Sequence, residues 1–144
     1  MEMDSSFRFG TCHFGNLKRE VSLTFLFQIR ILSGTLKEFA KKQEIDETML
    51  LSILRSLDLD REQFVKNMEE FSEGQKKKVL IAASLLTPAH LYLWDEPLNY
   101  IDVFSRMQIE KLIAQFQPTM LIVEHDARFA KKLATKVVDL SGSV

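Results

Sequence analysis

The sequence predicts an α/β fold in which a parallel sheet with flanking helices is joined to a small helical subdomain. Two patterns predict this class. Residues 34–70 carry apolar side chains at helical spacing and no strand pattern, whereas residues 88–140 alternate short apolar runs with amphipathic segments. Alternating strands and helices build parallel sheets because each helix crosses over a face of the sheet. The chain therefore divides into an N-terminal segment at 1–33, the helical subdomain at 34–70 and an alternating part at 71–144.

The N-terminal segment has no capping signals and contains five phenylalanines. Only residues 21–29 show the alternation that is typical of a strand. We expect two strands in this segment, one of them within that run.

Helical spacing organises residues 34–70. The apolar positions that define two helices are Leu36, Phe39 and Ala40 in the first and Met49, Leu50, Ile53, Leu54 and Leu57 in the second. Asp46 is suited to cap the second helix, because a short polar side chain can accept amide hydrogens of the first turn. Asp60 could cap a third helix that carries Phe64 and Val65.

Helices and strands alternate after residue 71. Ser72 is suited to cap a helix over 75–86, which Pro88 ends. The following run, 91–94, is short, apolar and partly aromatic, as expected of a buried strand. The remaining predicted elements are a helix at 103–116, a strand at 119–123, a helix at 127–134 and a last strand at 136–140.

The composition narrows the function classes. The chain has 144 residues, of which 46% are hydrophobic and 27% charged, and its formal net charge is -1. A near-neutral chain argues against nucleic-acid binding through a basic face. The single cysteine, Cys12, excludes an internal disulfide and a cysteine-based zinc site. The longest apolar stretch, 79–86, is far shorter than the roughly 18 residues of a membrane span, so we expect no span and a cytoplasmic location.

Two adjacent carboxylates, Asp95 and Glu96, follow the predicted strand at 91–94. Neighbouring strand residues point to opposite faces, so the two acids can take different roles. In a phosphoryl-transfer site one carboxylate can hold Mg²⁺ while the next orients the attacking water. The alternative is that Asp-Glu-Pro serves only solubility and turn formation after a strand.

The segment 71–75 begins the helix capped by Ser72. Its free backbone amides and the flexible Gly74 could face a phosphate. The same residues also form an ordinary helix start, and Glu73 argues against direct anion binding.

Three other polar features have structural interpretations, and two of them also have a functional one. His125 follows the strand at 119–123 and could bond a phosphate oxygen, or it could be a capping or surface residue. Asp102 is expected to cap the helix at 103–116. The lysine run 76–78 could touch nucleic acid, but we interpret it as a solvated helix face.

Taken in order and spacing, four segments resemble the C-terminal half of an ATP-binding cassette (ABC) nucleotide-binding domain, a partial P-loop NTPase fold. Residues 71–75 resemble the ABC signature, and residues 91–96 resemble the Walker B strand with its catalytic glutamate. Residues 99–102 resemble the D-loop, and His125 resembles the switch histidine.

A finer resemblance covers residues 32–140. The stretches at 94–102 and 124–129 are similar to the second cassette of the ABC-F subfamily, in its Lsa-like antibiotic-resistance branch of ribosomal protection proteins. This resemblance implies a soluble ATPase of twin cassettes that acts on ribosomes, with ATP and Mg²⁺ as cofactors.

The resemblance also implies which residues face a partner. Ser72, Gly74 and Gln75 would contact the γ-phosphate of ATP held by a second nucleotide-binding domain. Asp102 would lie at the interface between the two cassettes.

The resemblance assigns other residues to the chain's own reaction centre. Asp95 would serve Mg²⁺, and Glu96 and His125 would be catalytic, with Glu96 on the hydrolytic water and His125 on the γ-phosphate. Gln28 lies near the position of the family's glutamine-bearing loop, although its neighbours differ from the usual context.

Two departures from the family pattern bear on activity. Phe71 and Glu73 replace the usual leucine and first glycine of the signature. No Gly-x-x-x-x-Gly-Lys-[Ser/Thr] occurs in the sequence, so no such loop cradles the β- and γ-phosphates. We therefore expect the chain alone to bind ATP poorly and to hydrolyse little. We interpret residues 1–31 as a truncated, spliced or misread N-terminal portion.

Two alternatives to an ATPase portion stay open. The chain could be a non-enzymatic module that pairs with a complete cassette or docks to the ribosome. It could also be a fragment of a transporter ATP-binding subunit.

Overall fold

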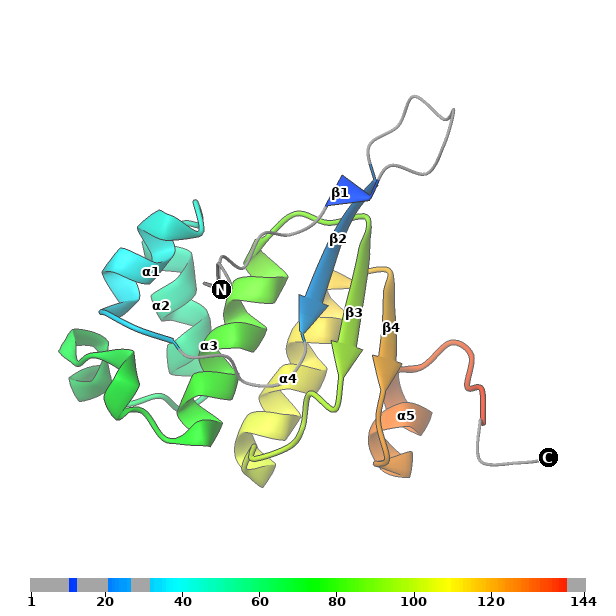
Figure 1. Cartoon of the computed structure of the whole chain (residues 1–144). Coiled ribbons are helices and arrows are strands. Elements are labelled where there is room, and N and C mark those ends of the chain that lie inside the picture. The colour runs from blue at the N-terminus through cyan, green and yellow to red at the C-terminus, as the bar shows by residue number, and fades with distance from the viewer. Residues whose placement is uncertain (1–10, 13–20, 27–31, 140–144) are drawn as a thin grey trace, which may run out of the picture.

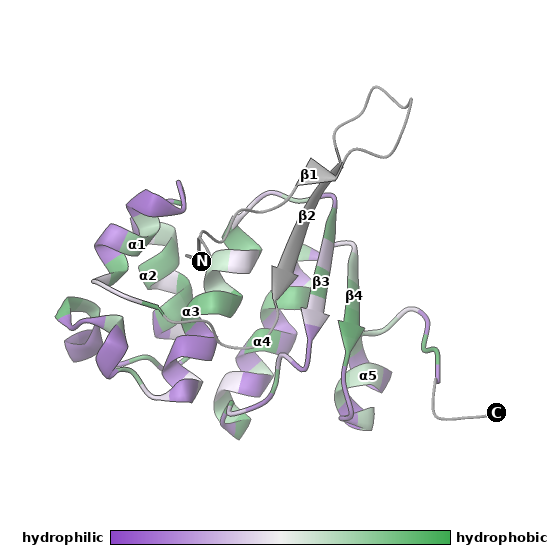
Figure 2. Cartoon of the chain, in the orientation of Figure 1, coloured by the Kyte–Doolittle hydropathy of each residue, from purple (hydrophilic) through white to green (hydrophobic). Residues whose placement is uncertain are grey.

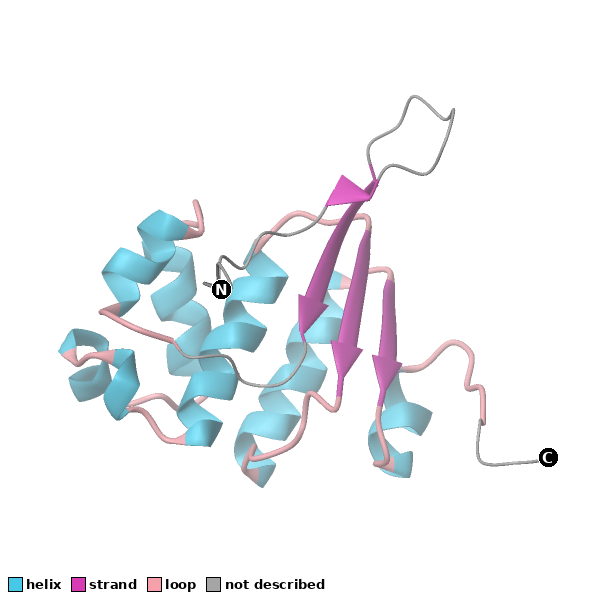
Figure 3. Cartoon of the chain, in the orientation of Figure 1, coloured by secondary structure: helices cyan, strands magenta, loops and turns pink. Residues whose placement is uncertain are grey.

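The structure is a computed structural model that describes residues 11–12, 21–26 and 32–139. The strands are β1 (Thr11–Cys12), β2 (Val21–Leu26), β3 (Leu91–Asp95) and β4 (Met120–Val123). The helices are α1 (Leu36–Lys42), α2 (Glu47–Ser56), α3 (Glu73–Leu86), α4 (Val103–Phe116) and α5 (Ala127–Leu133), with short 3-10 helices η1 (Arg61–Val65) and η2 (Met68–Glu70). Figure 3 shows the helical subdomain to one side of the sheet.

The sheet has the order β1-β2-β3-β4. β1 pairs antiparallel with β2, whereas β2, β3 and β4 run parallel, so that Leu93 lies opposite Leu121. Figure 1 shows α4 and α5 together behind the sheet. Leu121 and Val123 of β4 are exposed, so the face of β4 that carries these two side chains is open to solvent. Parallel strands joined through helices confirm the predicted α/β class.

Apolar side chains of the helical subdomain and of α3 form one core with the covered face of the sheet. Its fully buried members include Leu36, Leu50, Leu54, Leu57, Met68, Val79, Ile81, Trp94 and Ile109. Trp94 connects β3 to α3, because its indole Nε1 donates to Ser84 Oγ at 2.9 Å. Burying each large side chain contributes about 1.5–3 kcal/mol, and this burial fixes the sheet against the helices.

Most predicted elements are confirmed. Asp46 caps α2 by accepting the Met49 amide at 2.7 Å, and Ser72 caps α3 in a reciprocal capping box with Gln75. The helices over 103–116 and 127–134 and the strands over 91–94 and 119–123 appear within a residue or two of the expected bounds. Two strands also lie in the N-terminal segment, as predicted, although residues 27–29 lie outside the described residues.

Three predictions about local structure are wrong. Asp60 makes no side-chain capping bond, and the helix that follows it is a 3-10 helix. Two apolar residues are too few to define a helical stripe, and Val65 is 82% exposed. Residues 136–139 form no strand, because none of the described strands pairs with them. The third wrong prediction concerns the lysine run.

The lysines at 76–78 do not form a solvated face. Lys77 is 3% exposed and Lys78 is 7% exposed. Figure 2 shows α3 changing from hydrophilic at its start to hydrophobic along its body. The neighbouring subdomain and sheet surround α3 so closely that residues 77–85 are all buried. Aliphatic lysine stems can be buried in this way while the ammonium reaches a polar neighbour.

Candidate functional site

The carboxyl ends of β3 and β4 place the predicted acidic residues at one edge of the sheet. Asp95 is the last residue of β3, and Glu96 follows it with a φ of +46°. The Glu96 amide donates to the Val123 carbonyl at 2.8 Å, which joins the ends of the two strands. A left-handed conformation costs a non-glycine residue roughly 1–2 kcal/mol, so tertiary contacts must hold Glu96 in place.

Glu96 and His125 meet at this edge. His125 Nε2 lies 3.1 Å from Glu96 Oε1, and Asn99 Nδ2 donates to Glu96 Oε2 at 2.6 Å. The His125 side chain is 84% exposed, so its ring is open to solvent. A carboxylate and an imidazole in this arrangement can share a water molecule and move its proton.

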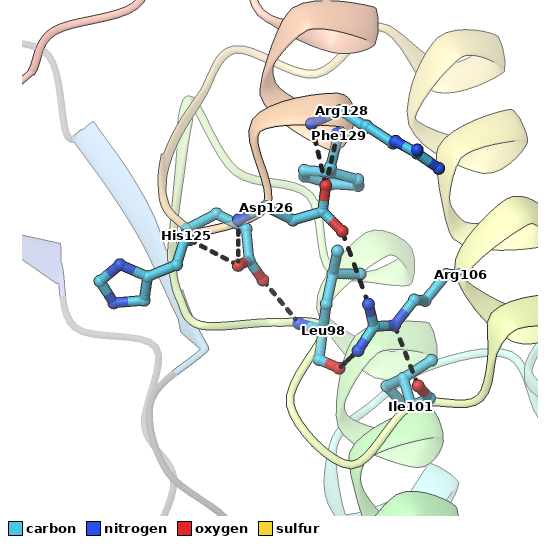
Figure 4. Close-up of polar contacts among 8 residues, drawn as sticks. Leu98, Ile101, Arg106, His125, Asp126, Arg128 and Phe129 are labelled. Atoms are coloured by element: carbon cyan, nitrogen blue, oxygen red, sulfur yellow. Dashed lines mark hydrogen bonds and ion pairs between the residues drawn. The ribbon is translucent and has the colours of Figure 1, made fainter.

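Glu124 bonds to backbone amides on two loops. Its Oε1 accepts the Leu98 amide at 3.1 Å. Its Oε2 accepts the amide of His125 at 2.7 Å and that of Asp126 at 3.3 Å (Figure 4). The loop after β3 is therefore tied to the loop after β4.

Arg106 of α4 links the same two loops from the other side. Its guanidinium donates to the Ile101 carbonyl at 3.0 Å and the Leu98 carbonyl at 3.3 Å, and it lies 3.5 Å from Asp126 Oδ2 (Figure 4). Arg106 and Glu124 were not among the site residues predicted from the sequence. Leu98, a partner of both side chains, lies 8 residues from Arg106 and 26 residues from Glu124 along the chain, and only the place of Glu124 beside the predicted histidine could have marked it.

Asp126 caps α5. Its Oδ1 accepts the amides of Arg128 at 2.9 Å and Phe129 at 3.1 Å. The hydrogen bond from the Phe129 amide is the largest cause that lowers the pKa of Asp126, and partial burial opposes it. The hydrogen bond from the Arg128 amide and the positive charges of Arg106 and Arg128 lower the pKa further. The carboxylate therefore stays ionised where it faces Arg106.

The first turn of α3 lies directly against the loop after β3. A Cβ placed on Gly74 would lie 2.5 Å from the carbonyl oxygen of Tyr100, a residue whose φ is +65°. Ser72 Oγ accepts the Gln75 amide at 3.2 Å, so its hydroxyl proton can still be donated to an external acceptor. Glycine at position 74 thus allows the close approach of the two segments.

Asp102 caps α4 as predicted and pairs with a buried lysine. Its Oδ1 accepts the Ser105 amide at 2.8 Å, and Lys78 Nζ lies 3.0 Å from its Oδ2. Burial acts to raise the pKa of Asp102, but the hydrogen bonds from Ser105 and Lys78 and the charge of Lys78 outweigh it and hold the pKa well below its usual range. This contact joins α3 to α4.

Lys77 supplies a buried positive charge near the acidic edge. Burial lowers its pKa, and the negative charges of Asp95, Glu96 and Glu124 oppose that shift. The exposed Glu73 is paired with Lys76, whose Nζ lies 3.5 Å from Glu73 Oε1. The negative charge in the first turn of α3 is thus partly compensated.

The residues of this edge differ in how well they suit the predicted Mg²⁺. No group of three or more histidine, cysteine or acidic residues in the described part of the chain could hold a metal by itself. Mg²⁺ usually takes one or two protein carboxylates and completes its shell with water and phosphate oxygens, so the half-buried Asp95 suits it. Gln28 lies outside the described residues.

A parallel sheet whose carboxyl edge carries Asp95, Glu96 and His125, beside a separate helical subdomain, defines a P-loop NTPase fold of the ABC type. The sequence profile of the family described as ABC transporter matches residues 13–99, more than half of the chain. The chain therefore belongs to the ABC transporter family. One solved neighbour, the ATP-binding cassette MJ0796 in a dimeric state bound to ADP and Pi, superposes with a TM-score of 0.64 at 20% identity, over 76% of this chain and 55% of that chain.

Individual relatives come from different branches. The tungstate uptake system ATP-binding protein TupC of Campylobacter jejuni is 34% identical over 133 residues, which cover 89% of this chain and 38% of TupC. The probable ATP-binding protein YheS of Haemophilus influenzae is 30% identical over 62% of this chain and 14% of YheS. The chain thus spans well under half the length of either relative.

One solved structure is also similar to this chain. The archaeal ribosome recycling factor aABCE1, in complex with the ribosomal stalk protein aP1, superposes with a TM-score of 0.63 at 25% identity. The match covers 83% of this chain and 25% of that chain. In the described residues, no helix has the length and apolar character that crossing a membrane requires.

Proposed function

We propose that this chain is the signature-to-switch portion of an ABC-F ATPase that acts on the ribosome in the manner of the Lsa-like resistance branch, in the cytoplasm. The observation that carries the ATPase assignment is the 3.1 Å contact between Glu96 and His125 at the edge where Asp95 ends its strand. The similarity to YheS and to a ribosome recycling factor supports the ABC-F and ribosomal part.

Each residue of the edge has a role in this proposal. Asp95 holds Mg²⁺, which offsets the negative charge of the phosphates. Glu96 orients the hydrolytic water and accepts its proton, and His125 donates a hydrogen bond to the terminal phosphate. Because no Gly-x-x-x-x-Gly-Lys-[Ser/Thr] occurs in the sequence, we expect the chain to bind ATP weakly and to turn over little or none.

Pairing with a complete cassette is the second part of the proposal. Ser72, Gly74 and Gln75 form the first turn of α3, where Ser72 is exposed and its hydroxyl proton is available. A helix start with free amides suits the terminal phosphate of ATP bound by the partner. Asp102, at the start of α4, lies next to that surface through its contact with Lys78.

Association with an intact ABC-F cassette tests the pairing. We expect sedimentation to show a complex only when ATP and Mg²⁺ are present, and the complex to be lost in Ser72→Arg. Ser33→Arg is the matched control, because Ser33 is also exposed but lies outside the signature turn. Association without ATP, or equal binding by both variants, would contradict the pairing.

Turnover by the chain alone tests the expected inactivity of the isolated chain. We expect no Mg²⁺-dependent release of phosphate above the level of Glu96→Gln. Turnover that disappears in Glu96→Gln would show that the chain is an active ATPase without the usual loop.

A transporter subunit is the competing candidate, and the similarity to TupC favours it. Pull-down with purified ribosomes and with a tungstate-type membrane permease discriminates between the two assignments.

A further inference from the structure

The loop between β3 and α4 contains two residues in the left-handed conformation, and side-chain hydrogen bonds fix a residue that lies between them. Glu96 and Tyr100 have φ values of +46° and +65°, and neither is glycine. Between them, Leu98 donates its amide hydrogen to Glu124 and accepts at its carbonyl from Arg106. Both polar groups of one residue are therefore fixed by side chains from other elements.

The same two side chains also hold the loop after β4. The second oxygen of Glu124 accepts the amides of His125 and Asp126, and Arg106 lies 3.5 Å from Asp126 Oδ2. Glu124 and Arg106 together are here named the two-loop clasp. Each member of the clasp touches both loops, and the loops carry Glu96 and His125.

Electrostatics argue that Glu124 has a role beyond solubility. Val123, the residue before Glu124, lies opposite Asp95 in the sheet, so Glu124 adds a third carboxylate to the edge that carries Asp95 and Glu96, where like charges repel one another. Three backbone amides and the buried Lys77 offset this repulsion. Arg106, in turn, uses its planar fork to reach two carbonyl oxygens and one carboxylate, a geometry that lysine cannot reproduce.

We propose that Glu124 and Arg106 are positioning residues for the reaction at this edge, because the two-loop clasp sets the distance between Glu96 and His125. The relevance to ATP hydrolysis rests on the proposed function, whereas the clasp itself is a property of the chain without nucleotide. Neither residue touches the reacting atoms. Both act through the backbone of the loops that carry the two groups.

Amide hydrogen exchange on the isolated chain tests the clasp. We expect Glu124→Ala to speed exchange of the Leu98 amide roughly tenfold, the loss expected for a hydrogen bond to a charged acceptor. The Ser105 amide, which donates to Asp102, should not change. Glu62→Ala is the matched control, because Glu62 is exposed and lies on η1. Unchanged exchange at Leu98, or an equal rise at Ser105, would overturn the proposal.

A spectroscopic readout tests the positioning. In an otherwise wild-type background, Glu96→Gln should shift the ¹H–¹⁵N signal of the His125 ring, because the side chains of residues 96 and 125 are in contact. In the Glu124→Ala background we expect this response to fall at least twofold. The same response in both backgrounds would show that the clasp does not position the pair. Arg106→Lys provides the same test if Glu124→Ala does not fold.

These results separate the two claims. The exchange and ring measurements need no nucleotide, so they decide the clasp even if ATP-dependent association is absent. Absent association would refute only the proposed function.

Discussion

The helical subdomain and the carboxyl edge of the sheet both contain left-handed residues, but different contacts hold them. In the subdomain, Glu44 and Asp58 follow the ends of α1 and α2. Each is enclosed by backbone bonds of its own helix, such as Leu59 N to Leu54 O at 3.0 Å, in the Schellman pattern. At the edge, side chains of distant elements hold the loop between Glu96 and Tyr100 instead.

This difference separates stability from function. A helix end that is closed by its own backbone needs nothing from the rest of the molecule. An edge held by Glu124 and Arg106 depends on the correct packing of β4 and α4, and it presents charged groups in a fixed arrangement. We therefore expect stability to reside mainly in the subdomain core and positioning at the edge.

The largest expected effect is in the core. Leu54 is fully buried in α2, so Leu54→Ala should lower the free energy of unfolding by about 3 kcal/mol through lost burial and a residual cavity. Urea denaturation followed by circular dichroism measures this change. Val65→Ala, at an exposed apolar residue, should change stability by less than about 0.5 kcal/mol. Equal losses in both variants would mean that the subdomain is not the stable part.

The next effect tests the contact between α3 and the edge. Gly74→Ala places a methyl group 2.5 Å from the Tyr100 carbonyl oxygen, which forces one segment to move and should cost about 2 kcal/mol. Thermal unfolding checks the loss, with Glu73→Ala as an exposed neighbour in the same turn. Unchanged thermal stability of Gly74→Ala would show that the loop after β3 can move aside at little cost in free energy.

A smaller effect depends on pH. The pKa of Asp102 is held below its usual value of 3.8, so the carboxylate stabilises the folded chain above that value. The contribution is lost as the pH falls through the lower folded-state pKa. The side chain is 51% exposed, so we expect less than about 1 kcal/mol. Lys78→Met should reduce the acid-induced loss of stability between about pH 4 and pH 2, measured by urea unfolding.

The smallest effect has the opposite sign. Asp58→Gly should stabilise the chain by about 0.5 kcal/mol, because glycine adopts the left-handed conformation without steric conflict. Thermal unfolding measures the gain. Glu69→Gly, at an exposed position without a positive φ, should be neutral or destabilising. A loss of stability at Asp58 would mean that its side chain has a role of its own.

The same contrast explains what the sequence could predict. The capping roles of Asp46, Ser72 and Asp102 were predictable, because each cap lies within three residues of its partner. The edge pair of Glu96 and His125 was predictable because parallel strands bring their carboxyl ends together.

Other residues were not predictable from local patterns. Lys77 and Lys78 belong to a run of three lysines that suggests a solvated face, yet their burial depends on what surrounds α3. Arg106 and Glu124 bond to backbone groups that lie up to 26 residues away along the chain. The expected strand at 136–140 had a suitable composition, but none of the described strands pairs with residues 136–139.

The positive φ of Glu96 has a consequence for evolution in the laboratory. A single base change converts a glutamate codon into a glycine codon, and glycine would relax this backbone position while removing the carboxylate. Selection for heat resistance alone would therefore favour the loss of the group that faces His125. Only selection that also demands chemistry would retain the strained glutamate.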